Sequence, residues 1–185
     1  MKVSKSTIIY LVVLVVAASL YRVIDRPMGF APQIAMALFG GMVIKNRVWA
    51  FALPLISMFI SDLFYQVLFI NGLTDIQGFY SGQITNYILL ASVTLVGFLF
   101  KKVTVVNVIA GSLIAPTWFF LASNFVVWVA GGGYQHPKTF DGLLQTMIDG
   151  LPFYRNSIVA TLFFSAIFFG VYYLVQKTSK KASVA

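Results

Sequence analysis

The sequence has no cysteine and no glutamate, and it has a single histidine, His136, among its 185 residues. The absence of cysteine excludes disulfides, cysteine nucleophiles and iron–sulfur clusters. One histidine is too few for a clustered metal site, so we expect no metal and no cofactor. The sequence also lacks a glycine-rich loop followed by Lys and Ser or Thr, which excludes a P-loop ATPase.

Charge is also scarce. Only 10% of the residues are charged and 59% are hydrophobic, whereas a soluble domain has about 25% charged residues. So little polar surface cannot cover a water-facing globule, and the chain is expected to be an integral membrane protein. The net charge of +8 is spread in short clusters between apolar runs. That pattern fits the positive-inside rule better than a nucleic-acid surface, so we expect no nucleic-acid partner.

Apolar runs divide the chain into candidate spans. A membrane-spanning helix needs about 20 apolar residues, and six segments approach that length. We therefore predict an all-α integral membrane protein, a single domain built as a bundle of six transmembrane helices. The expected spans are 7–21, 30–44, 48–70, 84–100, 103–130 and 157–175, with an outer loop at 131–156. The first segment could instead be a cleaved signal peptide, which would leave five spans.

The charged residues give the bundle an orientation. With both termini cytoplasmic, the cytoplasmic segments hold nine basic residues and no acid, and the outer segments hold four basic and four acidic residues. The positive-inside rule therefore favours cytoplasmic termini, and we expect a multi-pass protein of the bacterial inner membrane. The nine residues are Lys2, Lys5, Lys45, Arg47, Lys101, Lys102, Lys177, Lys180 and Lys181.

Asp62 is the remaining acid, and it lies inside the third apolar segment. A carboxylate at the centre of a span costs about 2.5–3.5 kcal/mol even on lenient insertion scales, and such residues usually mark a functional site. Tyr65 and Gln66 follow at three and four residues, which places all three side chains on one helix face. Asp62 is therefore the leading candidate for a functional residue.

Other amide, hydroxyl and aromatic side chains fall in the outer half of the predicted bundle. Together with Asp62 they predict an outward-facing polar pocket for a small solute, and a lone carboxylate favours a cationic or donor-rich ligand. Two alternatives stay open: interhelical hydrogen bonds for the amides, and an interfacial aromatic belt for the rings. The predicted binding residues are Asp62, Asn124, Gln33, Tyr65, Asn86, Trp128, Asn156 and Arg155.

Small residues recur at a spacing of four in the second segment. Ala31 and Ala35 form one such pair, and Ala37 and Gly41 form another. This spacing lets two helices approach closely. The partner could be another span of the same chain or a second membrane protein.

Several short motifs lie along the chain from about Pro27 onward. They are Phe30-Ala31-Pro32, the run 37–41, Pro54 with Ser61-Asp62, Ser123-Asn124-Phe125 with Trp128, and the run 152–156. These motifs resemble those of an uncharacterised family of small bacterial membrane proteins. That family is in turn similar in size and topology to the S components of energy-coupling-factor (ECF) transporters, which bind a solute for uptake. The resemblance implies a transmembrane coupling protein with cytosolic ATPases as partners, and Ala31, Ala35, Ala37 and Gly41 as a docking face.

We therefore expect a membrane subunit that binds a small solute in an outward-facing polar pocket around Asp62. Catalysis is not expected, because the only histidine lies in a predicted loop and Asp62 is the only intramembrane carboxylate. Two other functions remain open. The chain could be a stand-alone proton-coupled transporter with Asp62 as its proton site, or a structural or assembly subunit of a larger membrane complex.

Overall fold

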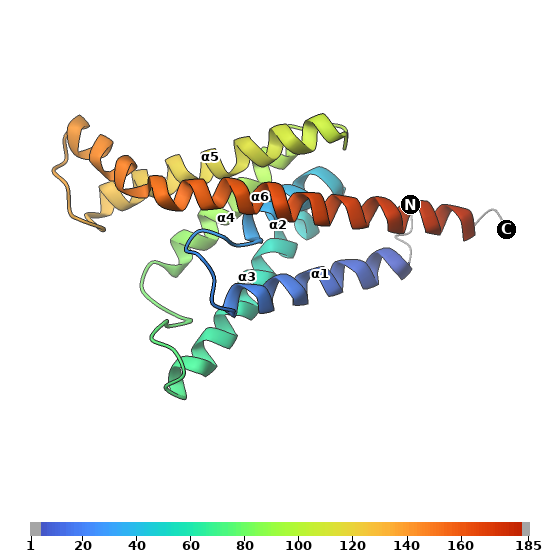
Figure 1. Cartoon of the computed structure of the whole chain (residues 1–185), viewed down its shortest axis with the longest axis horizontal. Coiled ribbons are helices and arrows are strands. Elements are labelled where there is room, and N and C mark those ends of the chain that lie inside the picture. Colours follow the sequence, from blue (N-terminus) through green and yellow to red (C-terminus); the bar gives the residue numbers. More distant parts are fainter. Residues whose placement is uncertain (1–4, 183–185) are drawn as a thin grey trace.

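The computed structural model describes residues 5–182, without the side chains of residues 179–182, so Lys2 and the side chains of Lys180 and Lys181 lie outside it. The described residues form helices and no strand, as predicted. The helices in this part of the chain are α1 (Lys5–Val23), α2 (Gln33–Val43), α3 (Arg47–Ile70), α4 (Gln83–Phe98), α5 (Val105–Ala130) and α6 (Phe140–Ala182). Figure 1 shows them as one elongated bundle.

Four of these helices, α1, α3, α5 and α6, are long and apolar enough to cross a membrane, and α2 and α4 are shorter apolar helices. The outward-facing side chains of the long helices are themselves apolar. On α5, for example, Ile109, Leu113, Leu121 and Phe125 are all exposed. Such side chains face water at a cost and lipid at none. The surface therefore fits contact with membrane lipid.

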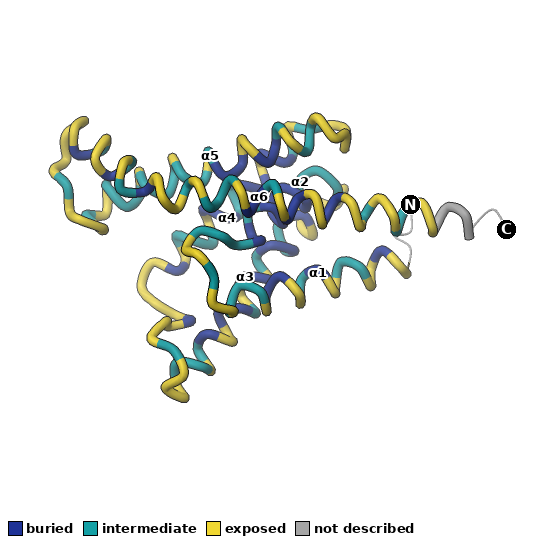
Figure 2. The backbone as a smooth tube through the Cα atoms, viewed as in Figure 1, coloured by how far each residue is buried: buried dark blue, intermediate teal, exposed yellow. Residues whose placement is uncertain are grey.

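Helix α2 forms the centre of the bundle, and seven of its 11 residues are buried. Phe39 packs edge-on against Tyr10 of α1 and Phe169 of α6, with ring centroids 6.0 and 5.1 Å apart. Leu38 joins a second cluster that includes Val93 of α4 and Ala115 of α5. In Figure 2 the dark-blue buried positions concentrate around α2. A helix that is apolar on all sides is expected to be buried in this way.

The small residues of α2 pack within the chain. A Cβ atom on Gly41 would lie 2.3 Å from the carbonyl oxygen of Thr94 and 2.8 Å from Cα of Gly97. Only glycine allows this close approach of α2 and α4. Ala35 and Ala37 are fully buried, so neither has a surface that could contact a second protein in this structure. Ala31 is half-buried before the helix begins.

The outer loop is shorter than predicted. We expected a loop over 131–156, but α6 begins at Phe140 and continues through Pro152, so the segment between α5 and α6 is only 131–139. The hydroxyl of Thr139 accepts a hydrogen bond from the amide of Gly142 at 3.2 Å and caps this end. The outer part of α6 packs along α5. The helix therefore extends well beyond the apolar run that we expected to span the membrane.

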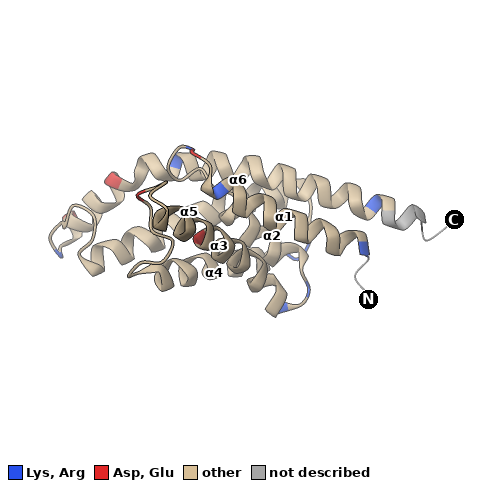
Figure 3. Ribbon diagram, turned by 90° about the horizontal axis from the view of Figure 1, so that it is seen from below, with Lys and Arg blue, Asp and Glu red and all other residues tan. Residues whose placement is uncertain are grey.

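The two ends of the bundle differ in charge. The start of α1 and the end of α6 lie at the same end (Figure 1). The acidic positions, drawn in red in Figure 3, all lie away from that end, whereas basic positions occur at both. The segments 24–32, 71–82 and 131–139 join the helices at the opposite end from the termini. Asp62 belongs to this loop-bearing half.

Candidate functional site

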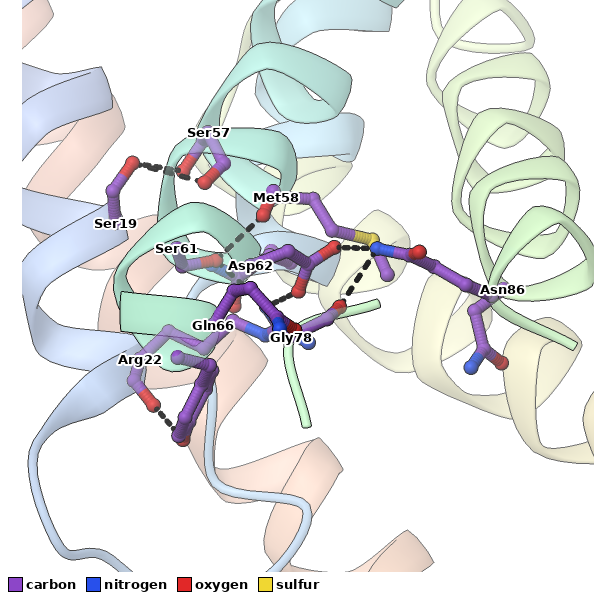
Figure 4. Close-up of polar contacts among 12 residues, drawn as sticks. Ser19, Arg22, Ser57, Met58, Ser61, Asp62, Gln66, Gly78 and Asn86 are labelled. Carbon is purple, nitrogen blue, oxygen red and sulfur yellow. Dashed lines mark hydrogen bonds and ion pairs between the residues drawn. The ribbon is translucent and has the colours of Figure 1, made fainter. Parts of the chain in front are cut away.

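Asp62 lies in the C-terminal half of α3 and is 1% exposed. Its Oδ1 atom forms an ion pair with Nη1 of Arg22, which comes from the last turn of α1. The same Nη1 donates a hydrogen bond to the hydroxyl of Ser61 at 2.7 Å. Figure 4 shows Arg22 and the α3 residues around Asp62. The carboxylate is therefore paired with a guanidinium group.

The other carboxylate oxygen is held by α4. Nε2 of Gln83 donates to Oδ2 at 2.6 Å, and the hydroxyl of Tyr87 donates to the same atom at 2.7 Å. Gln83 and Tyr87 are four residues apart and so lie on one face of α4. Asp62 thus connects three helices, α1, α3 and α4. We call Arg22, Asp62, Gln83 and Tyr87 the Asp62 cluster.

Segment 71–82 folds back over this cluster. Nε2 of Gln83 also donates to the carbonyl oxygen of Gly78 at 3.0 Å, and Oε1 of Gln66 accepts the amide of Phe79 at 3.2 Å. A Cβ atom on Gly78 would lie 1.9 Å from the carbonyl oxygen of Asp62. Position 78 therefore requires glycine, because any side chain would push the segment off α3. This segment separates the carboxylate from the loop-bearing face.

The backbone of Arg22 is fixed as well as its side chain. Its carbonyl oxygen accepts the hydroxyl of Tyr65 at 2.6 Å and two bonds from the Arg26 guanidinium, at 3.2 Å from Nε and 3.1 Å from Nη2. Carbonyls at a helix C-terminus lack intrahelical partners, and these donors replace them. Burial lowers the pKa of Arg26 from its usual range, although an arginine remains charged in proteins. The Arg26 guanidinium therefore helps to hold the backbone of the residue that pairs with Asp62.

The predicted binding residues fall into separate groups. The structure brings Tyr65 to the Asp62 cluster through Arg22. Gln33 of α2 contacts α1 one turn before Arg22. Its Nε2 makes a long 3.5 Å hydrogen bond to the carbonyl oxygen of Ala18, and its Oε1 is buried without a hydrogen-bond partner among the described residues. Asn86 instead donates to the hydroxyl of Tyr80. Tyr65 therefore lies at the Asp62 cluster, and Gln33 contacts α1 at Ala18, four residues before Arg22.

The remaining predicted residues belong to α5 and α6. Asn124 donates to its own helix at Phe120, at 2.8 Å, and its side chain lies against Gly150. Trp128 donates to the carbonyl oxygen of Pro137 at 2.9 Å, which holds segment 131–139 to α5. Asn156 donates to the carbonyl oxygen of Met28 at 2.8 Å. The hydrogen bonds found for these three side chains therefore go to parts of the structure other than the Asp62 cluster.

Arg155, the last of the predicted residues, is exposed on α6. The guanidinium that pairs with Asp62 is instead that of Arg22, one of the four basic residues of the predicted outer segments. Gln83 and Tyr87 were also missed, although their spacing of four on one helix face was a usable signal. Arg22 carried a weaker signal, because it ends the first apolar run near the depth of Asp62.

The Asp62 cluster offers hydrogen-bond donors, an acceptor and both signs of charge. Among residues 5–182 no group of three or more His, Cys, Asp or Glu side chains could hold a metal. The nearest hydroxyl on α3, that of Ser61, donates to the carbonyl oxygen of Met58 at 2.7 Å and accepts from Arg22. The groups of the cluster can bind a polar molecule, and they also join α1, α3 and α4.

Comparison with known proteins places the chain without assigning it an activity. No curated protein and no solved structure matches it. A family of unknown function, DUF6580, matches residues 2–183. The match covers nearly the whole chain, and the protein therefore belongs to the DUF6580 family.

Proposed function

We propose that this protein is a membrane subunit that binds a small polar solute, with the Asp62 cluster as the polar wall of its binding site. The solute would enter from the loop-bearing end, beneath segment 71–82. In this proposal the chain crosses the bacterial inner membrane six times with both termini in the cytoplasm. The short helices α2 and α4 would pass through the membrane inside the bundle, where they need not match the full hydrocarbon thickness.

The buried Arg22–Asp62 ion pair is the observation that carries this proposal. Burying two charges costs several kcal/mol per ion, and replacing a buried pair with apolar residues is often neutral or stabilising. The bundle therefore gains little stability from using charges at this position. Ionisable groups at membrane depth are rare, and their usual roles are in substrate or ion pathways.

The ion pair also changes the expected class of solute. A lone carboxylate would favour a cation, but Arg22 forms an ion pair with Asp62 and neutralises its charge. A solute that replaces these contacts must both donate and accept hydrogen bonds. A polar neutral or zwitterionic molecule meets that requirement. The unpartnered Oε1 of Gln33 would add one acceptor, since Gln33 contacts α1 one turn before Arg22.

Uptake of such a solute needs an energy source that this chain does not supply. The sequence has no P-loop, so we propose a transmembrane coupling protein with cytosolic ATPases as partner, as the resemblance to S components implies. The alternative of a proton-coupled carrier has less support, because a proton site must release its partner and Asp62 has three.

A structural role is the second candidate, and one observation favours it. Both carboxylate oxygens of Asp62 already have protein donors, from Arg22, Gln83 and Tyr87. A cluster that only joins α1, α3 and α4 would show the same bonds. In that case the chain would be an assembly subunit of a larger complex, and no solute would displace these donors.

A ligand screen with a matched pair of variants separates the two candidates. The purified protein is tested for thermal stabilisation by a library of small polar solutes, since a ligand at 100 times its Kd adds about 2.7 kcal/mol if it binds only the folded state. We expect a hit that Asp62→Asn abolishes and that Asp75→Asn, at an exposed loop acid, preserves. A hit that survives Asp62→Asn would contradict the assigned site, and no hit at all would favour the structural role.

A further inference from the structure

A second polar feature lies at the other end of α3. A hollow of about 170 Å³ lies where α2 ends, α3 begins and α4 ends. Arg47 is 15 positions before Asp62 on α3, which separates the hollow from the Asp62 cluster by about 22 Å at 1.5 Å per residue. The lining residues are Gly41, Met42, Val43, Ile44, Lys45, Arg47 and Phe98.

Two cations border this hollow. Lys45 and Arg47 are both exposed, and the Arg47 guanidinium carbon lies 3.9 Å from the ring centroid of Phe98. Stacking on an aromatic ring orients a guanidinium while leaving its edge free to donate hydrogen bonds. No aspartate of the described residues lines the hollow. The hollow therefore presents a fixed positive charge to any group that enters it.

The rim of the hollow is apolar and exposed. Val48 and Leu99, each next in the chain to a residue that lines the hollow, are both 74% exposed, and Trp49, two residues after Arg47, is 62% exposed. Tryptophan is enriched where a membrane protein meets the lipid headgroups. An apolar rim beside a cationic hollow matches a lipid molecule, which joins acyl chains to a charged headgroup. A soluble acidic protein would match the charge and leave this rim unexplained.

We propose that the hollow binds the phosphodiester headgroup of an anionic phospholipid. Lys45 and Arg47 contact the phosphate, and the acyl chains lie along Val48, Trp49 and Leu99. Basic pockets between transmembrane helices are known to bind such headgroups. This site is independent of the proposed solute site, because it lies at the opposite end of the bundle.

Quenching of Trp49 fluorescence by brominated lipid tests the proposal. Trp118 and Trp128 are replaced with phenylalanine, and the protein is placed in phosphatidylcholine bilayers that contain a small fraction of brominated phosphatidylglycerol or brominated phosphatidylcholine. We expect stronger quenching by the brominated anionic lipid. Each lost charge should weaken that preference about fivefold, from about 1 kcal/mol per basic residue, so Lys45→Gln with Arg47→Gln should weaken it about 25-fold.

The control removes the same charge elsewhere. Lys5→Gln with Lys177→Gln takes two exposed cations from the end that carries the termini, outside the hollow, and should leave the preference intact. A thermal melt checks that each variant is folded. If the double variant does not fold, Arg47→Gln alone should weaken the preference for the anionic lipid about fivefold. Equal quenching by both lipids, or an equal loss in both double variants, would overturn the proposal. Equally tight binding of glycerophosphoglycerol, which has the same phosphodiester headgroup without the acyl chains, would also overturn it.

Discussion

The Arg22–Asp62 pair predicts an asymmetric response to removing either partner. The Asp62 side chain is 2% exposed and the Arg22 side chain is 18% exposed. Arg22→Met leaves a buried carboxylate with no counter-charge, and removing one partner of a buried pair costs about 3–5 kcal/mol. Asp62→Asn leaves a guanidinium that can reach solvent. Asp62→Asn should therefore cost less than Arg22→Met, about 1.5–3 kcal/mol of stability, which is the range for a hydrogen bond to a charged group.

The double variant makes the prediction quantitative. Arg22→Met with Asp62→Asn leaves neither charge, so it should be less destabilised than the sum of the two single variants by about 2 kcal/mol or more, within the range for contacting residues. The free energy of unfolding is measured by denaturant titration in detergent micelles. Arg155→Met and Asp75→Asn, both at exposed positions, serve as controls and should each change stability by less than about 0.5 kcal/mol. Effects at Arg22 and Asp62 that add within about 0.5 kcal/mol would refute the pairing.

Two further predictions concern the surroundings of Asp62. Gly78→Ala should destabilise the protein by about 1–3 kcal/mol, because the new Cβ would overlap the carbonyl oxygen of Asp62. The control Gly170→Ala has open space around it and should be neutral or slightly stabilising in the same thermal melt. Tyr87→Phe removes a hydrogen-bond donor to the Asp62 carboxylate and should lower the free energy of unfolding by about 1.5–3 kcal/mol. The control Tyr80→Phe, at an exposed loop hydroxyl, should lower it by less than about 0.5 kcal/mol. Equal losses of stability in the two variants would contradict the role of Tyr87.

The helices were predictable from the sequence because each is an apolar run with recognisable ends. Asn46 and Thr104 cap α3 and α5 as their residue types suggest, by accepting the amides of Trp49 and Asn107 at 3.2 Å each. The start of α6 was missed because Gly150 and Pro152 interrupt the apolar pattern there. Packing along α5 allows the helix to continue through both, and a single-sequence pattern contains no record of that contact.

Asp62 was identifiable as a candidate because a carboxylate in an apolar run is costly wherever the run folds. Its partners were less accessible. Arg22 is 40 residues from Asp62 along the chain, and only the packing of α1 against α3 brings them together. Asn86 was chosen in place of Gln83 and Tyr87, since composition alone does not say which face of α4 points inward. The position of a residue along its helix was therefore predictable, and the direction in which its side chain points about the helix axis was not.

The accessibility of a single cysteine beside Asp62 tests most directly whether the cluster is a binding site. The chain has no native cysteine, so Ser61→Cys introduces one thiol next to the carboxylate, and Ser57→Cys places a control one turn deeper; both serines are 0% exposed. In intact membranes, we expect a water-soluble methanethiosulfonate to modify the thiol at position 61 from the loop-bearing side. A bound solute should slow this reaction. The control thiol at position 57 should stay unmodified. A thiol at position 61 that is as unreactive as the one at position 57 would contradict the account and would show that the cluster only holds the helices together.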